Sequence, residues 1–99
     1  QETGVNIMIA TFSFKISNSF DEWANFYDND INEKKDLLAS LGIKPMFRAS
    51  NVDDPNEVIL CWETPSREII EEFLTVNEAN IAQSGHIIES TTLKFFQHS

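Results

Sequence analysis

The chain has 99 residues, the length of one small domain. Seven basic and sixteen acidic residues give it a formal net charge of −9, and 41% of its residues are hydrophobic. Nucleic acids and anionic membranes are bound through clustered lysine and arginine, so this composition argues against both as partners. We expect the domain to span residues 5–99, with residues 1–4 a remnant of processing or expression.

The first strand is predicted at Val5–Ile16, where hydrophobic residues alternate along the chain. Every second residue from Met8 onward lies on one strongly apolar face. The opposite face is apolar only at its start, where it carries Ile7 and Ile9. Such a half-apolar second face predicts contact with a partner.

The first helix is predicted to begin after Ser19, because Ser19 and Glu22 have the spacing of a capping box. Hydrophobic residues then keep helical spacing as far as Leu41, and Gly42 is typical of a helix end. The run Asp28–Asp30 favours an interruption, since these side chains compete for backbone hydrogen bonds.

The next two strands are predicted at Ile43–Asn51 and Glu57–Glu63. A turn at Asp53–Asn56 joins them into a hairpin, because Pro55 suits a turn position with a fixed φ. The second of these strands is apolar on both faces, which is typical of a central strand that is covered twice.

A second helix is predicted from Thr64-Pro65 to about Gln83, with Thr64 as its cap and a break near Thr75–Asn77. The last strand is predicted at Ile87–Gln97. The resulting order β-α-β-β-α-β is the ferredoxin-like α+β arrangement, a four-stranded antiparallel sheet with two helices on one face. The uncovered face, with Ile7 and Ile9, predicts a two-fold homodimer.

The cleft between the first helix and the sheet is the candidate site for a small ligand. Its predicted lining consists of Trp23, Phe26, Met46, Arg48, Trp62 and His86. Arg48 either holds a ligand carboxylate in the cleft or pairs with surface acids outside it. His86, the only candidate for a catalytic group, acts as a general acid or base, or as a cation at the end of the second helix.

Metals and cofactors are not expected. The run Asp28–Asn32 imitates a calcium loop, but Glu33 and Ala39 stand where that loop needs glycine and glutamate. Cys61 is the one cysteine, so an internal disulfide is impossible and a reducing, cytoplasmic location is expected. Its place in the middle of a strand predicts a buried structural thiol.

The element order resembles the dimeric α+β barrel superfamily, which includes antibiotic-biosynthesis, haem-degrading and stress-responsive proteins. The matching features are Phe20–Trp23, Phe47-Arg48 before the predicted turn, and the strand Val58–Glu63 that leads into a helix. Within this superfamily the chain is most similar to a small uncharacterised family from marine cyanobacteria. That similarity rests on Thr11–Phe14, Phe20–Trp23 and the tail Ser84–Thr91, and it implies a fold without an established activity.

The resemblance also implies a test for haem degradation. Members with that activity carry an asparagine on the first strand, a tryptophan on the second helix and a ligand histidine about three turns later. Asn6 stands at the first position, but Phe73 and Gln83 occupy the other two, and His86 comes three residues late. The leading hypothesis is therefore a dimeric protein that binds a small apolar or aromatic ligand. The alternatives are a cofactor-independent oxygenase that uses the same cleft, with Asn25, Tyr27 and Trp62, or a protein-interaction module that uses the open sheet face.

Overall fold

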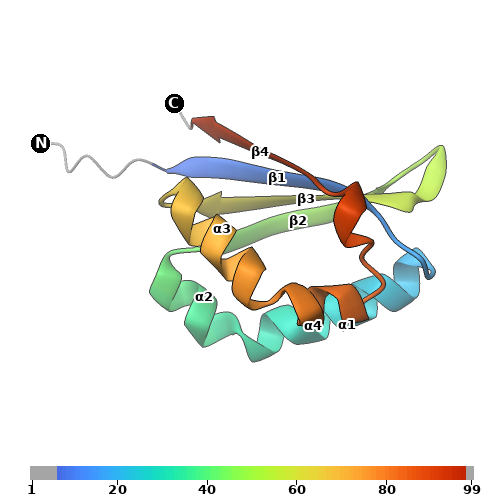
Figure 1. The fold of residues 1–99 in the computed structure, drawn as a ribbon, viewed down its shortest axis with the longest axis horizontal. Helices are drawn as coiled ribbons and strands as arrows, with labels where there is room; N and C mark the ends of the chain where they lie inside the picture. The colour runs from blue at the N-terminus through green and yellow to red at the C-terminus, as the bar shows by residue number, and fades with distance from the viewer. Residues whose placement is uncertain (1–6, 98–99) are drawn as a thin grey trace, which may run out of the picture.

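The computed structural model describes residues 7–97 and shows one antiparallel sheet of four strands in the order β2-β3-β1-β4. All of its α-helices lie on one side of the sheet (Figure 1). The elements are β1 Met8–Lys15, α1 Phe20–Glu33, α2 Lys35–Leu41, β2 Lys44–Asn51, β3 Asp54–Thr64, α3 Arg67–Val76, α4 Glu78–Gln83, the 3₁₀ helix η1 Ile88–Ser90 and β4 Thr92–Gln97. The ferredoxin-like α+β fold predicted from the sequence is confirmed.

The core lies between the helices and the inner face of the sheet, as the alternation in β1 predicts. Phe12, Phe14 and Ile16 are at most 3% exposed, and Ile70 of α3 is fully buried against the same layer. β1 pairs with β3 on one side and with β4 on the other, so it is a central strand. Burial of these side chains supplies the main driving force for folding. The predicted start of β1 at Val5 and Asn6 lies outside the described residues.

The first helical segment begins as predicted but divides in two. Ser19 caps α1 in a complete capping box with Glu22. The interruption comes at Lys34, four residues later than Asp30, and α2 then runs to Leu41. Gly42 ends α2 with a φ of 77°, the left-handed conformation that glycine adopts most readily. The predicted break at Asp28–Asp30 is therefore wrong, because those residues form regular helix with their carboxylates turned to other partners.

Two predicted boundaries are corrected by local hydrogen bonds. The hairpin turn is at residues 52–53, and β3 already begins at Asp54, which pairs with Asn51 across the hairpin and with the side chain of Lys15. The second helix is capped by Ser66, which accepts a hydrogen bond from the Ile69 amide, so Thr64 instead ends β3. The break predicted near Thr75–Asn77 is confirmed, because α3 ends at Val76 and α4 begins at Glu78.

The segment before β4 also differs from the prediction. Ile87–Thr91 is not strand: the 3₁₀ helix η1 occupies residues 88–90, and regular pairing with β1 starts only at Thr92. His86 forms an isolated bridge with Ile16, and the Ile87 amide donates to the Lys15 carbonyl. These hydrogen bonds hold the start of the segment that leads into β4 beside β1, although residues 87–91 are not part of the sheet.

The outer face of the sheet carries no helix (Figure 1) and exposes large hydrophobic side chains. Phe47 is 55% exposed, Ile59 40% and Phe96 51%. Ile9 is half-buried between Glu63 and Phe96 in the strand register. We define the outer patch as Ile9, Phe47, Ile59, Cys61 and Phe96, which the strand register places on this face.

Cys61 carries a free thiol on the outer patch and is partly exposed, so the prediction of a buried cysteine is wrong. Partial burial raises the pKa of this thiol, which favours its protonated form at neutral pH. A cytoplasmic location stays a prediction. Within residues 7–97, no helix is both long enough and apolar enough to cross a membrane.

Candidate functional site

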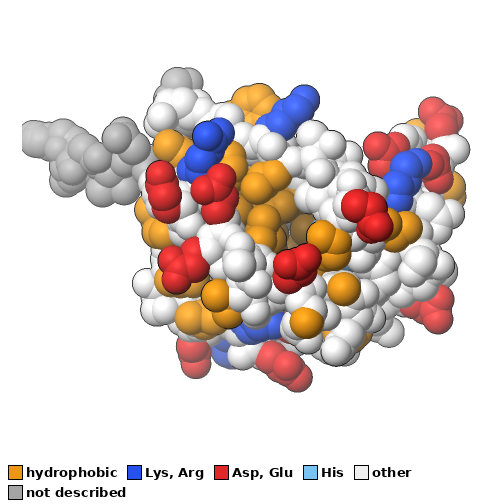
Figure 2. Space-filling model, viewed as in Figure 1, with side chains coloured by type: hydrophobic (Ala, Val, Ile, Leu, Met, Phe, Trp, Pro, Cys, Tyr) orange, Lys and Arg blue, Asp and Glu red, His pale blue; other side chains and the backbone are white. Residues whose placement is uncertain are grey.

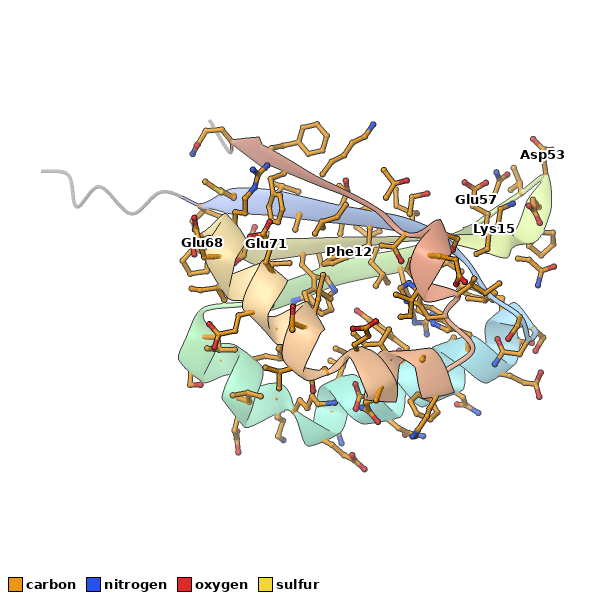
Figure 3. All side chains as sticks on the ribbon, viewed as in Figure 1. Phe12, Lys15, Asp53, Glu57, Glu68 and Glu71 are labelled. Atoms are coloured by element: carbon orange, nitrogen blue, oxygen red, sulfur yellow. The ribbon has the colours of Figure 1, made fainter. Side chains whose placement is uncertain are left out.

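A cavity lies between the inner face of the sheet and helices α1, α3 and α4. The cavity has a volume of about 50 Å³, counted as the space that the centre of a water molecule can occupy. One water needs ~10–15 Å³ on the same measure, so the cavity is several times larger. A second, more open hollow of about 220 Å³ adjoins it and shares the side chains of Phe12, Leu74, Ile81 and His86. Figure 2 shows a depression with a hydrophobic floor on this side of the molecule, and Figure 3 shows Phe12 on the helix side of the sheet.

Aromatic rings form most of the cavity wall. Trp23 and Tyr27, one helical turn apart on α1, stack with their ring centroids 4.9 Å apart. Trp62 of β3 meets Phe12 edge-on at 5.0 Å and Phe73 of α3 at 5.8 Å. Because these rings pack against one another in favoured geometries, they form a rigid wall that is already shaped to contact an apolar ligand.

Tyr27 supplies the polar group nearest to these rings. Its hydroxyl oxygen accepts a hydrogen bond of 2.9 Å from the indole nitrogen of Trp62. The hydroxyl proton is donated to no other described residue, so it remains free for a ligand. Burial raises the pKa of Tyr27 to about 12, and the phenol is therefore a neutral donor at physiological pH.

A polar edge joins α1 to α4 at one end of the cavity. The Oδ1 atom of Asp30 accepts hydrogen bonds from Asn80, at 2.7 Å, and from the ammonium group of Lys34. The bond to Asn80 ties the short helix α4 to α1 across the cavity opening. This bond is one of the contacts that hold α4 beside the cavity, together with its packing against α3 and η1.

His86 closes the cavity on the side of η1. Its ring stacks on Phe14 with centroids 3.7 Å apart and an interplanar angle of 6°, and its Nε2 atom is 2.6 Å from the hydroxyl of Thr91. Burial lowers the pKa of His86 from 6.5 to about 4. The imidazole is therefore neutral at pH 7, and the expectation of a cation at the helix end is wrong.

A tight loop holds His86 in this place. Gly85 has a φ of 101°, a conformation that side chains with a Cβ rarely adopt. A Cβ at Gly85 would also come within 2.4 Å of the side chain of Asn18. Asn18 donates a hydrogen bond to the Ser84 carbonyl, so the loop after α4 is tied to the loop after β1.

The lowered pKa of His86 predicts a pH dependence of stability. The unfolded chain binds a proton at His86 below pH 6.5, whereas the folded chain does so only below about 4. The free energy of unfolding is therefore expected to fall as the pH drops from 6.5 to 4, by on the order of 1–3 kcal/mol after allowance for partial exposure. Urea denaturation across this range measures the slope, and His86→Phe, which keeps a ring on Phe14, serves as the control. Equal slopes in the two proteins would contradict the assignment.

Four of the six predicted ligand residues line this cavity: Trp23, Phe26, Trp62 and His86. Met46 does not, and is 46% exposed on β2. Arg48 is also absent from the lining, because its guanidinium group makes two hydrogen bonds to Asp28, at 2.7 and 2.9 Å, and lies over the Phe20 ring. Of the two interpretations of Arg48, pairing with a surface acid is the one the structure shows.

Other residues enter the cavity that the ligand prediction missed. They are Phe12, Asp30, Ile31, Leu60, Phe73, Leu74, Asn80, Ile81 and Ser84, together with Tyr27, which was considered only for the oxygenase alternative. The spacing of Tyr27 four residues after Trp23 was the available signal for its role. Asn25, by contrast, is exposed. Nothing in the sequence indicates that Asn80 meets Asp30, since the two lie fifty residues apart.

The residues at two of the three positions relevant to haem degradation differ in their exposure. Phe73 is buried in the cavity wall, Gln83 is exposed at the end of α4, and Asn6 lies outside the described residues. Among the residues that the structure describes, no group of three or more histidine, cysteine or acidic side chains is placed to hold a metal ion.

Solved structures of other proteins share this fold, and two of them show how far the similarity extends. One is described as a candidate antibiotic biosynthesis monooxygenase from Bacteroides thetaiotaomicron, with 12% sequence identity, a TM-score of 0.59, and coverage of 95% of this chain and 89% of that one. The other is a monooxygenase from the gene ActVA-Orf6 of Streptomyces coelicolor in complex with nanaomycin D, with 8% identity, a TM-score of 0.59, and coverage of 93% and 87%. At these identities the similarity shows the fold alone.

No curated protein matches the chain. Residues 7–98 match a family that is described as a domain of unknown function, DUF3764. This match covers nearly the whole chain, whereas the expected cyanobacterial source stays a prediction. The chain therefore belongs to the DUF3764 family.

Proposed function

We propose that this protein is a homodimer that binds a small aromatic molecule in the cavity between the sheet and helices α1, α3 and α4. The observation that carries the proposal is the wall of braced rings around Trp23, Tyr27 and Trp62, with one phenol proton left unused. Binding sites for small molecules are typically apolar, with a few polar groups that fix orientation. An aromatic ring that bears one hydrogen-bonding group matches this combination.

A cofactor-independent oxygenase that uses the same cavity is the second candidate. It is favoured by the fold shared with the monooxygenase from Streptomyces coelicolor, which was solved with nanaomycin D. Oxygenation of a phenol begins with removal of a proton, and His86 is the cavity residue that the sequence analysis names as a general base. Because burial lowers the pKa of His86 to about 4, it is a weak base toward a phenol whose pKa is near 10. This mismatch favours binding over catalysis.

The homodimer is supported by the charge distribution on the outer face of the sheet. The chain carries a net charge of −9, which would oppose the approach of a second copy at most surfaces. On the outer face the charges balance: Lys15, Lys44 and Lys94 accompany Asp54, Glu57 and Glu63. A two-fold axis through this face would bring the two outer patches together without strong repulsion.

Ligand binding is tested by filling the cavity. Leu74 lines both the cavity and the adjoining hollow, so Leu74→Trp is expected to occupy the space that a ligand would use. With 2-phenylethanol as the probe, isothermal titration calorimetry should show a loss of affinity of at least about tenfold. Leu37→Trp is the matched control, because Leu37 is 46% exposed on α2 and lies outside the cavity.

The outcomes separate the two candidate functions. Binding by the wild type and by Leu37→Trp, but not by Leu74→Trp, supports a ligand site in the cavity. Equal binding by all three proteins contradicts that location. Consumption of dissolved oxygen in the presence of an oxidisable phenol such as 1-naphthol would instead favour the oxygenase, provided that it stops in Leu74→Trp.

A further inference from the structure

The charged side chains that line the cavity and the adjoining hollow are of one sign. Asp30 lines the cavity and Glu78 lines the adjoining hollow, whereas neither lining includes a lysine or an arginine from residues 7–97. Figure 2 shows acidic side chains near the rim of the depression. The lining therefore presents carboxylates and aromatic rings to a ligand, and the lysine beside it, Lys34, is paired with Asp30.

Asp30 keeps part of its negative charge available. Its Oδ1 atom is occupied by Lys34 and Asn80, which offsets one side of the carboxylate. The Oδ2 atom accepts no hydrogen bond from any described residue. Glu78 is exposed at the start of α4 and has no ion-pair partner among residues 7–97, so its charge faces the entrance uncompensated.

None of the other lysine and arginine residues of the described chain lines the cavity or the adjoining hollow, and Lys35 is exposed at the start of α2. Lys15, Lys44 and Lys94 belong to the outer face of the sheet. Arg48 is paired with Asp28, and the guanidinium carbon of Arg67 lies 4.8 Å from the centre of the Phe95 ring. A carboxylate ligand in the cavity would consequently be buried without a cationic partner, which is costly.

The aromatic rings, like the carboxylates, favour a cationic ligand. The faces of aromatic rings carry partial negative charge and attract cations. Tyr27 stays neutral, and the second lone pair of its hydroxyl oxygen can accept a hydrogen bond from an ammonium group. An organic ammonium group held near Glu78 would keep part of its hydration and gain from both the carboxylate and the rings.

We propose that the cavity selects its ligand by charge: it takes aromatic amines in their ammonium form and rejects aromatic carboxylates of the same shape. This inference rests on the proposed ligand cavity and narrows the class of ligand that it holds. An uncompensated carboxylate within about 8 Å of the ligand charge changes affinity on the order of tenfold at the dielectric of a protein surface.

Three probes of one shape and different charge test the proposal: 2-phenylethylammonium, 2-phenylethanol and phenylacetate. Titration calorimetry at low salt is expected to rank them in that order, with about tenfold between neighbours. Glu78→Gln should lower the ammonium affinity and raise the carboxylate affinity by about tenfold each, and so reduce their ratio by about a hundredfold, while it leaves the alcohol unchanged. Asp53→Asn is the matched control, because it removes the same charge at the tip of the hairpin, far from the cavity (Figure 3).

The results for the alcohol separate this inference from the proposed function. If the alcohol binds and all three affinities are equal, or the carboxylate binds best, charge selection is overturned while the cavity remains a ligand site. If Asp53→Asn and Glu78→Gln change the ratio of ammonium to carboxylate affinity equally, the selection comes from overall net charge. That result would overturn the role of the cavity rim. Failure of all three probes to bind contradicts both proposals.

Discussion

Replacing Phe14 with alanine is expected to lower the free energy of unfolding by about 3–5 kcal/mol. Phe14 is 1% exposed, and its ring contacts His86 on one side and Trp23 on the other, at centroid distances of 3.7 and 5.6 Å. Truncation removes a buried ring and leaves a cavity that the braced aromatic side chains cannot fill. Since small domains are stable by only about 5–15 kcal/mol, this one change should approach the limit of folding.

Urea denaturation followed by tryptophan fluorescence measures this loss, because Trp23 is a direct neighbour of Phe14. Val76→Ala is the control: Val76 is 75% exposed on α3, and its truncation should change stability by less than about 0.5 kcal/mol. A Phe14→Ala protein as stable as Val76→Ala would show that this part of the core is not packed as described.

Placing a charge in the outer patch is expected to abolish the proposed homodimer. Ile59 is 40% exposed at the centre of the outer face, on β3 between β1 and β2. In Ile59→Asp an unpaired carboxylate would be buried against its symmetry mate, which should weaken association by at least about a hundredfold. Ile9→Asp should also weaken association, because Ile9 is half-buried on the same face of the neighbouring strand β1.

Sedimentation equilibrium measures the effect, with Val52→Asp as the matched control. Val52 is 94% exposed in the hairpin turn, so the same chemical change there leaves the outer patch intact. Monomers for Ile59→Asp and dimers for Val52→Asp support the sheet-to-sheet dimer. A wild-type protein that is monomeric at all concentrations would contradict the homodimer and favour the third hypothesis, in which this face binds a different chain.

Elements with strong local signals were predictable from the sequence. The capping box at Ser19 and Glu22 fixes the start of α1 within one turn, and Gly42 fixes the end of α2. Alternation in β1 identifies Phe12 and Phe14 as core residues. These signals act over a few residues and depend only on backbone hydrogen bonding and on side-chain periodicity, which is why they survive in the folded protein.

The details of the site depended on contacts between distant residues, and the sequence does not record these. A bulge between Pro45 and Phe47 shifts the alternation of β2, so that Phe47 joins the outer patch and Arg48 turns toward Asp28 on α1. Met46 is left exposed by the same irregularity. The predicted cleft lost Met46 to this irregularity. Arg48 lies opposite Leu60 on the helix side of the sheet, and it leaves the cavity lining because Asp28 holds its guanidinium group.

His86 shows the same division between local and tertiary information. The sequence by itself determined the fold class, the pairing of β2 with β3 as a hairpin and the place of His86 just after a glycine. Only the tertiary structure decided that His86 lies flat on Phe14 rather than at the helix end as a cation. The physical reason is burial: desolvation depends on what the rest of the chain packs around a group, and that packing lowers the pKa of the imidazole to about 4.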